Sequence, residues 1–171
     1  GVRIMCLPGG HLKWDVMDAV IARVRPFGWH PIVQFDGRET AEREAQLKRI
    51  EGPYVIDRVG KFLEPVAIDH AAFKALLRLV ERGNCYVKLS AVYETSKTGR
   101  PHYSDVGALA KALVAAAPER MLWASNWPHP GQVGAAYPDD ATMLDLLVEW
   151  APREADRQKI LVENPARLYG F

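Results

Sequence analysis

The sequence predicts an α/β fold in which parallel strands are joined by helices. Apolar segments of strand length alternate five times with segments of helical spacing, and no hairpin signal joins two consecutive strands. This alternation favours parallel strands with right-handed helical crossovers. An open doubly wound sheet and a (β/α) barrel both satisfy it, although no glycine-rich phosphate-binding motif favours a nucleotide site on an open sheet. The 171 residues fit one domain, whereas an eight-unit barrel usually needs about 250, so a barrel would lack its first three strands.

The composition argues against nucleic-acid and membrane partners. The 22 basic and 21 acidic side chains leave a formal charge of +1, and no apolar segment approaches the roughly 20 residues that span a bilayer. The amino end has no signal-peptide pattern, and Cys6 and Cys85 lie in apolar runs without metal-ligand spacing. We therefore expect a cytoplasmic protein with buried free thiols and a small-molecule partner.

The first half of the chain contains three strands and two helices. Residues 1–7 form an apolar run that contains Arg3 and ends at Pro8-Gly9-Gly10, which predicts a covered strand followed by a loop. Residues 17–24 then place apolar side chains three and four positions apart, which predicts an amphipathic helix. The next elements are a strand at 30–35, a weaker charged helix at 39–50 and a strand at 53–57.

The second half continues the alternation. Asp69 is expected to cap the next helix and Gly83 to end it, and a strand follows at 85–91. The polar loop 93–102 is long enough to shape a pocket, although its composition fits a solvated connection slightly better. The remaining helices are predicted around 106–113, at 140–150 and through Leu161, before a short last turn capped by Asn164 and started by Pro165.

Residues 121–130 are the most informative stretch, because an apolar strand opens there into a proline-containing loop. Pro128 and Pro130 keep a helix from starting directly after the strand. The loop therefore holds Asn126, Trp127 and His129 at the carboxyl end of a strand, which is where ligands bind in α/β proteins. The alternative is that Trp127 and His129 are packing and capping residues of an ordinary loop.

Several motifs together resemble the amidohydrolase-related family, in particular its pyrone-dicarboxylate lactonase and sugar-lactone hydrolase branch. They are residues 121–130, residues 163–171, Gly1-Val2-Arg3, Gly28-Trp29-His30, Val55-Ile56-Asp57 and Val87-Lys88-Leu89-Ser90. The resemblance implies a (β/α)8 TIM barrel, of which residues 1–171 form one domain holding the fourth to eighth βα units. It also implies hydrolysis of a lactone or related ester by attack of water on an acyl carbon. The His-x-His pair of the family's first strand is absent, so we expect no metal ligands from this chain, and a divalent metal held by missing amino-terminal residues remains open.

Two departures from the family bear on the chemistry. Asn126 stands where the family commonly has an aspartate, and an amide cannot remove a proton near neutral pH, although it can orient a water or a carbonyl group. Arg58 stands where relatives often have a histidine, so a permanent cation replaces a proton relay. The arginines that bind a dicarboxylate in that branch are replaced by Gly9 or Gly10 and by Glu94, so its particular substrate is not expected here.

The candidate site consists of catalytic and substrate-binding residues from separate strand ends. The expected catalytic residues are Asn126 and His129, and the expected substrate-binding residues are Arg3, Arg58, Lys61, Tyr93 and Trp127. Arg3, in an apolar strand, needs an anionic partner, which is either a substrate carboxylate or an internal salt bridge to Asp57. For Arg58 and Lys61 the alternative is solvent exposure, and for the aromatic residues and His129 it is packing. Lys88 is expected to be structural.

Two functional hypotheses follow. The first is a hydrolase of a small, anionic lactone or related ester, in which Asn126 positions water and the cations hold charge. The alternative is a non-catalytic protein that binds a small ligand on the same scaffold, because both proton-handling residues of the family are replaced. An incomplete barrel would expose strand edges and apolar helix faces, so a homo-oligomer or other self-association is also expected.

Overall fold

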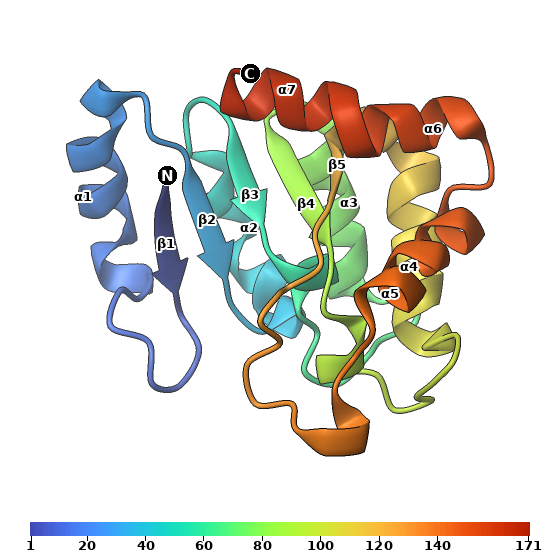
Figure 1. The fold of residues 1–171 in the computed structure, drawn as a ribbon. Helices are drawn as coiled ribbons and strands as arrows, with labels where there is room; N and C mark the ends of the chain where they lie inside the picture. Colours follow the sequence, from blue (N-terminus) through green and yellow to red (C-terminus); the bar gives the residue numbers. More distant parts are fainter.

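Five parallel strands stand side by side in the order in which they occur in the chain (Figure 1). The computed structural model describes residues 1–171 except for the side chain of Ala135. The strands are β1 (Val2–Met5), β2 (Pro31–Gln34), β3 (Tyr54–Ile56), β4 (Cys85–Leu89) and β5 (Met121–Trp123). A doubly wound sheet reverses its strand order at a switch point, whereas this order is sequential, as in part of a (β/α) barrel.

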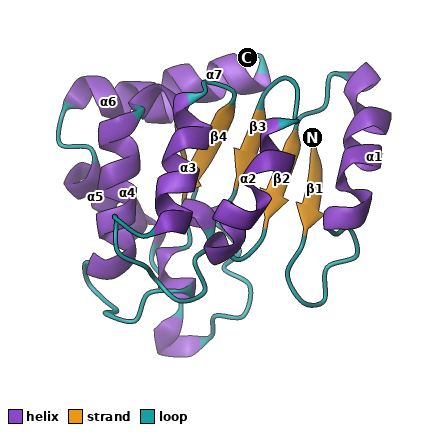
Figure 2. Cartoon of the chain, turned by 180° about the vertical axis from the view of Figure 1, so that it is seen from behind, coloured by secondary structure: helices purple, strands orange, loops and turns teal.

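Helices cover one face of the sheet (Figure 2). Those that connect consecutive strands include α1 (Trp14–Val24), α2 (Thr40–Lys48), α3 (Ala71–Glu81) and α4 (Ser104–Ala116), and α5 (Asp140–Trp150) follows β5. The register aligns Ile4 with Val33, Val33 with Ile56 and Ile56 with Val87, so these side chains share one face. All four are fully buried in the main core, together with Phe73 and Leu76 of α3 and Leu109 of α4.

The opposite face, called the inner face here, has a smaller apolar layer. Val55, Tyr86 and Leu122 form it, and Leu168 packs against them. Leu168 belongs to the last helical segment, which comprises α6 (Glu154–Gln158), a π-helical turn (Lys159–Glu163) and α7 (Asn164–Tyr169). Figure 1 shows this segment crossing the end of the sheet at which the strands begin, while the loops that follow β3, β4 and β5 extend from the other end. One end of the sheet is therefore covered by this helical segment, and the other end, called the loop pole here, carries the loops.

The predicted order of strands and helices is confirmed, but two predicted caps are wrong. His70, and not Asp69, caps α3, because its ring Nδ1 accepts a hydrogen bond from the Ala72 amide at 3.2 Å. Asn164 does not start a separate helix, since α6, the π-helical turn and α7 follow one another without a break. Its fully buried side chain instead donates to the Pro118 and Met121 carbonyl oxygens, both at 2.8 Å.

A search for membrane-spanning segments among the described residues finds no helix with the length and apolarity needed to cross a bilayer.

Candidate active site

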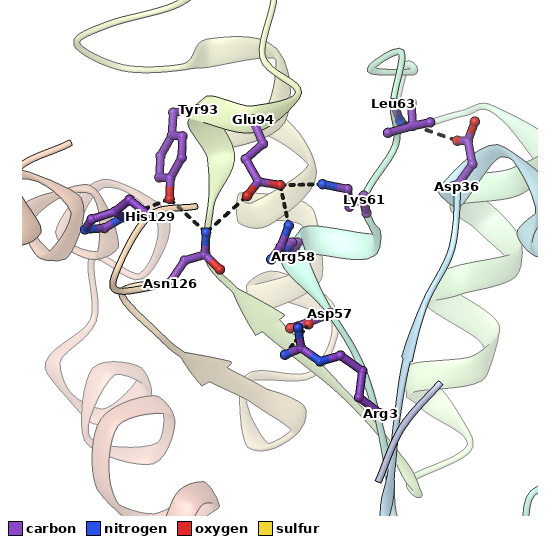
Figure 3. Close-up of polar contacts among 10 residues, drawn as sticks. All are labelled: Arg3, Asp36, Asp57, Arg58, Lys61, Leu63, Tyr93, Glu94, Asn126 and His129. Carbon is purple, nitrogen blue, oxygen red and sulfur yellow. Dashed lines mark hydrogen bonds and ion pairs between the residues drawn. The ribbon is translucent and has the colours of Figure 1, made fainter. Parts of the chain in front are cut away.

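Polar side chains from the ends of three neighbouring strands meet in one hydrogen-bonded network (Figure 3). We call this the loop network, and its members are Arg58 and Lys61 after β3, Tyr93 and Glu94 after β4, and Asn126 and His129 after β5. Because β3, β4 and β5 are parallel neighbours, their carboxyl ends lie at the same edge of the sheet. Segments far apart in the sequence are thereby brought together.

Most of the loop network is carried on unusual backbone. Arg58, Lys61, Asn126 and His129 have φ values of 56°, 43°, 68° and 52°, in the left-handed region that glycine adopts most easily. Each such residue costs on the order of 1–3 kcal/mol and persists only where its surroundings hold it, and residues of this kind cluster at functional sites. The strained residues lie on two separate loops that meet at the same place, which supports a functional interpretation of the network.

Glu94 lies at the centre of the network and is only 11% exposed. Its Oε2 accepts from Arg58 Nη1 at 2.5 Å and from the Lys61 ammonium group, and its Oε1 accepts from Asn126 Nδ2 at 3.1 Å. The side chains of Arg58 and Lys61 are 13% and 10% exposed, so this is a largely buried cluster of two cations and one carboxylate. Removing one partner from such a cluster leaves a buried charge unpaired, which is strongly destabilising.

Asn126 has its side-chain orientation fixed by two acceptors. Its Nδ2 donates to the Tyr93 hydroxyl at 2.8 Å as well as to Glu94. The reverse orientation would place the amide oxygen against the Glu94 carboxylate, so the arrangement has only one favourable form. Oδ1 therefore points away from both partners, as Figure 3 shows, and can accept a hydrogen bond from a water or a ligand hydroxyl.

A hydrogen bond to Tyr93 connects His129 to the rest of the loop network. The imidazole is 1% exposed, and its Nδ1 lies 2.8 Å from the Tyr93 hydroxyl oxygen. That hydroxyl accepts from Asn126 and can in turn donate its own proton to Nδ1; in this tautomer the imidazole carries its proton on Nε2, 3.0 Å from Asp140 Oδ1. Burial raises the pKa of Tyr93, and the hydrogen bond from Asn126 acts in the opposite direction. Burial thus favours the neutral phenol, which has a proton available for His129.

A second charged cluster lies on the inner face, next to the loop network. Arg3 Nη2 is 3.1 Å and Lys88 Nζ is 4.0 Å from the carboxylate of Asp57, which is 3% exposed. Of the two interpretations of Arg3, the internal salt bridge to Asp57 is the one observed, but nearly half of the Arg3 side chain remains exposed. Burial lowers the pKa of Lys88, with the neighbouring Asp57 carboxylate opposing that effect. The cluster has two cations for one carboxylate.

The structure brings six of the seven predicted site residues into these two adjoining clusters. Trp127 is the exception, since it is 72% exposed and its contact in the loop is a backbone hydrogen bond to Ser125 Oγ at 3.1 Å. No sequence motif indicated the central position of Glu94, which stood out only as the loss of an arginine, or the position of Asp140 beside His129. Among the described side chains, no group of three or more His, Cys, Asp or Glu residues is placed to hold a metal ion.

Known proteins are similar to this chain along its whole length. The amidohydrolase family model matches residues 1–171. A D-galactarolactone isomerase from Agrobacterium fabrum is 42% identical over 170 residues, which are 99% of this chain and 58% of the relative. A 4-sulfomuconolactone hydrolase from Hydrogenophaga intermedia is 32% identical over 174 residues, covering 99% of this chain and 57% of that protein.

A solved structure supports the same relationship. An apo crystal structure from Agrobacterium tumefaciens superimposes with a TM-score of 0.92 at 42% identity, and the match covers 99% of this chain and 60% of that one. This chain therefore spans less than two-thirds of the length of these relatives.

Proposed function

This chain belongs to the amidohydrolase family, and from that premise we propose that the full-length protein acts on the lactone or related ester of a small, anionic organic acid. Relatives named as a lactone isomerase and a lactone hydrolase support this substrate class. We further propose that the five βα units of residues 1–171 are the fourth to eighth of a (β/α)8 barrel. Its active site would then lie at the loop pole, where the active sites of such barrels are found.

The observation that carries the proposal is the hydrogen-bonded chain from Asn126 through Tyr93 to His129. Oδ1 of Asn126 aligns the attacking oxygen by accepting its hydrogen bond. As the water oxygen bonds to the acyl carbon, the water proton that is not bonded to Asn126 passes to the Tyr93 oxygen while the Tyr93 proton moves to Nδ1 of His129. The Asp140 carboxylate beside Nε2 stabilises the resulting imidazolium. The ring acyl–oxygen bond then breaks, and the proton returns from His129 through Tyr93 to the leaving alkoxide oxygen. The residue that replaces the family's aspartate thus positions the nucleophile, and the imidazole accepts the proton through the phenol.

Charge recognition is assigned to Arg3, with Lys88 beside it. The two cations share the single carboxylate of Asp57, and the guanidinium of Arg3 is accessible, so a substrate carboxylate can approach it. We assign Arg58 and Lys61 to the substrate-binding mouth as well, where their contacts with Glu94 would hold the loop network in place beside the substrate. Tyr93 and Trp127 would contact the body of the substrate.

The attacking oxygen decides which reaction results. Attack by water opens the lactone to the free acid, whereas attack by a second hydroxyl group of the substrate breaks the same acyl–oxygen bond and closes a different ring. Asn126 Oδ1 can accept from either donor. Hydrolysis is the reaction we propose, and product analysis separates it from isomerisation, since only hydrolysis adds an acidic group.

The central test uses the Tyr93→Phe variant of the full-length protein. Loss of the phenolic hydroxyl breaks the proton path, and we expect kcat for a panel of lactones to fall by about 100-fold or more, with KM changed by less than about threefold. Tyr103→Phe is the matched control, because the buried Tyr103 hydroxyl has no hydrogen-bond partner among the described groups. Equal activity of the Tyr93→Phe and Tyr103→Phe variants would exclude this mechanism.

The alternative function is non-catalytic binding of a small ligand on the same scaffold. Its support is the replacement of the family's aspartate and histidine by Asn126 and Arg58. On this hypothesis the natural protein binds lactones without turnover, and the double variant Asn126→Asp/Arg58→His gains activity. Turnover of any lactone by the natural protein eliminates it.

The remaining assignments are also proposals. We propose that the protein works in the cytoplasm on a small organic acid or lactone, without nucleic-acid or membrane partners, and that it forms a homo-oligomer. We propose no cofactor bound by residues 1–171, so a divalent metal used by the full-length protein would need ligands from elsewhere in it. Metal analysis of the purified full-length protein, before and after chelation, tests that assignment.

A further inference from the structure

Glu94 is the acceptor at which three donors from two other loops converge. Arg58 and Lys61 both bind its Oε2, and Asn126 binds its Oε1. All three charged side chains are 10–13% exposed, so their charges are screened by neighbouring protein groups more than by water. The positive charges of Arg58 and Lys61 are therefore compensated in part by the carboxylate of Glu94.

The pairing of both cations with Glu94 changes which ligands the loop network can bind. A second anionic group on a ligand that approached Arg58 or Lys61 would also approach Glu94 at close range, and like charges in a poorly solvated site repel strongly. The inner-face cluster also has two cations for one carboxylate, but it differs in exposure: nearly half of the Arg3 side chain is exposed, so a ligand carboxylate can reach its guanidinium group. Beside Glu94, the group that is free to bind is the uncharged amide oxygen of Asn126, which suits a hydroxyl donor.

We propose that Glu94 is the specificity-determining residue of this site. By pairing with both Arg58 and Lys61 and placing its own charge beside them, it selects a hydroxylated substrate with one carboxylate, bound toward Arg3, and rejects a second carboxylate at the loop network. This inference rests on the proposed function, because it names the substrate class of the same site. A purely structural Glu94 would hold three loops together and would affect all anionic ligands equally.

The test uses two open-chain sugar acids that differ in one group. D-galactonate has one carboxylate, and galactarate has a second carboxylate at the other end of the same hydroxylated chain. Neither is a lactone, so titration calorimetry on the full-length protein measures their binding without turnover. In the natural protein we expect galactonate to bind at least as tightly as galactarate. Glu94→Gln should raise the affinity for galactarate about tenfold or more and change that for galactonate by less than about threefold.

Glu64→Gln is the matched control, because Glu64 forms an exposed ion pair with Lys97 outside both clusters. It should leave the ratio of the two affinities unchanged. The Lys61→Gln variant provides a second measurement that does not require substitution of Glu94. With one cation removed, the Glu94 charge is less compensated, so the ratio of galactarate affinity to galactonate affinity should fall about threefold or more.

Each outcome separates the two proposals. An unchanged ratio of affinities in Glu94→Gln, or an equal loss of both ligands in Lys61→Gln, overturns the role of Glu94 and leaves the proposed function standing. If the natural protein binds neither acid and turns over no lactone, both proposals fail. If the ratio shifts as expected but no lactone is turned over, charge selection by Glu94 is supported and the catalytic proposal alone is lost.

Discussion

Asn126 and Glu94 depend on each other. The amide donates to Glu94 Oε1 at 3.1 Å. A side chain at position 126 that has only acceptor atoms would therefore place one hydrogen-bond acceptor opposite another. The aspartate that the family commonly has at this position would put two carboxylates within hydrogen-bond distance. The departures from the family pattern at positions 94 and 126 therefore belong to one change in the polarity of the site.

We expect Asn126→Asp to lower the free energy of unfolding at neutral pH by about 1–3 kcal/mol, through two lost hydrogen bonds and carboxylate repulsion. Chemical denaturation of the single variant and of Asn126→Asp/Glu94→Gln measures this effect. The double variant should lose clearly less stability than the sum of the losses in Asn126→Asp and Glu94→Gln, since Gln restores a donor opposite the new carboxylate. Strictly additive losses in the two substitutions would show that residues 94 and 126 do not interact.

Asp105 provides a prediction about pH. Burial would raise its pKa, but hydrogen bonds from Ser96, from the Lys97 and Val106 amides and from Thr98 dominate and lower it from 3.8 to about 2. The folded state thus favours the charged carboxylate, so its contribution to stability is complete above about pH 4 and is lost as the pH falls toward 2. Asp105→Asn should flatten the dependence of the unfolding free energy on pH in this interval, as followed by urea denaturation. Asp145→Asn, on the exposed side of α5, should retain it.

The sequence predicted the positions of the candidate site residues better than their interactions. The convergence of Arg58, Lys61, Tyr93, Asn126 and His129 was predictable because they follow apolar strands, and strand ends of a parallel sheet converge. Most partners were not predictable, since they depend on side-chain direction and on loop backbone in the left-handed region. The salt bridge of Arg3 to Asp57 was one of two expected alternatives, and only the three-dimensional arrangement decided between them and showed the central position of Glu94.

At the scale of the elements, one buried amide links the last helical segment to the sheet, in addition to the apolar contacts of Ile160 and Leu168. Asn164 donates to the carbonyl oxygens of Pro118 and Met121, immediately before and at the start of β5. The bond to Met121 is buried, so water does not readily replace a lost donor there. The attachment fixes α7 against the ends of the strands, where Leu168 reaches the apolar layer of the inner face.

Replacing Asn164 by alanine should therefore cost about 2–4 kcal/mol of stability, through two lost hydrogen bonds, one of them buried, and a small cavity. Thermal and chemical unfolding of the variant measure the loss. Gln158→Ala is the matched control on the same segment, since Gln158 is exposed, and its effect should stay within about 0.5 kcal/mol. Similar stabilities for the two variants would contradict the role given to the buried amide.

The turn that carries Arg58 and Lys61 depends on Gly60. Its φ is +79°, and a Cβ atom there would lie 2.8 Å from a Leu76 methyl group and 2.9 Å from the Phe62 ring. Gly60→Ala should destabilise the protein by about 2–4 kcal/mol, by adding steric overlap to the backbone cost. Gly52→Ala is the control, because Gly52 has a φ of +73° with open space around it, so it should show the backbone cost of about 1 kcal/mol alone. Calorimetric melting of both variants separates the two contributions.

The elements themselves were largely predictable from periodicity. Apolar runs bounded by glycine, proline and polar residues gave all five strands, and apolar residues three and four positions apart gave the helices. The caps of α3 and of the last helical segment were not predictable, because both depend on contacts that exist only in the folded protein. His70 competes with the adjacent Asp69 for one cap position, and Asn164 has its partners more than 40 residues away in the chain.

For the molecule as a whole, the sheet has two edges in the described structure. β1 and β5 each pair with one neighbour only among the strands of residues 1–171. Apolar side chains are exposed in the chain between β1 and β2, where Phe27 is 75% and Trp29 is 51% exposed, and on α5, where Val148 is 55% exposed. In the proposed full barrel, further βα units would cover both edges.

We therefore expect residues 1–171, produced without the rest of the protein, to self-associate, while the full-length protein has a defined size in light scattering. The double substitution Phe27→Ser/Trp29→Ser should reduce association of the isolated segment. Val133→Ser, which removes an apolar side chain that is 79% exposed in the loop after β5, should have little effect. A stable monomer of residues 1–171 at high concentration would argue against the incomplete-barrel interpretation.

The segment that crosses the starts of the strands lies opposite the loops that carry Arg58, Glu94 and Asn126. Substitutions at the α7 end are therefore limited mainly by stability, whereas substitutions in the loops of the proposed site also affect ligand binding. Directed evolution confined to the three loops could alter ligand preference while α7 and its attachment keep the protein folded. Randomising the opposite end would be expected to yield mostly insoluble variants and few with a new ligand preference.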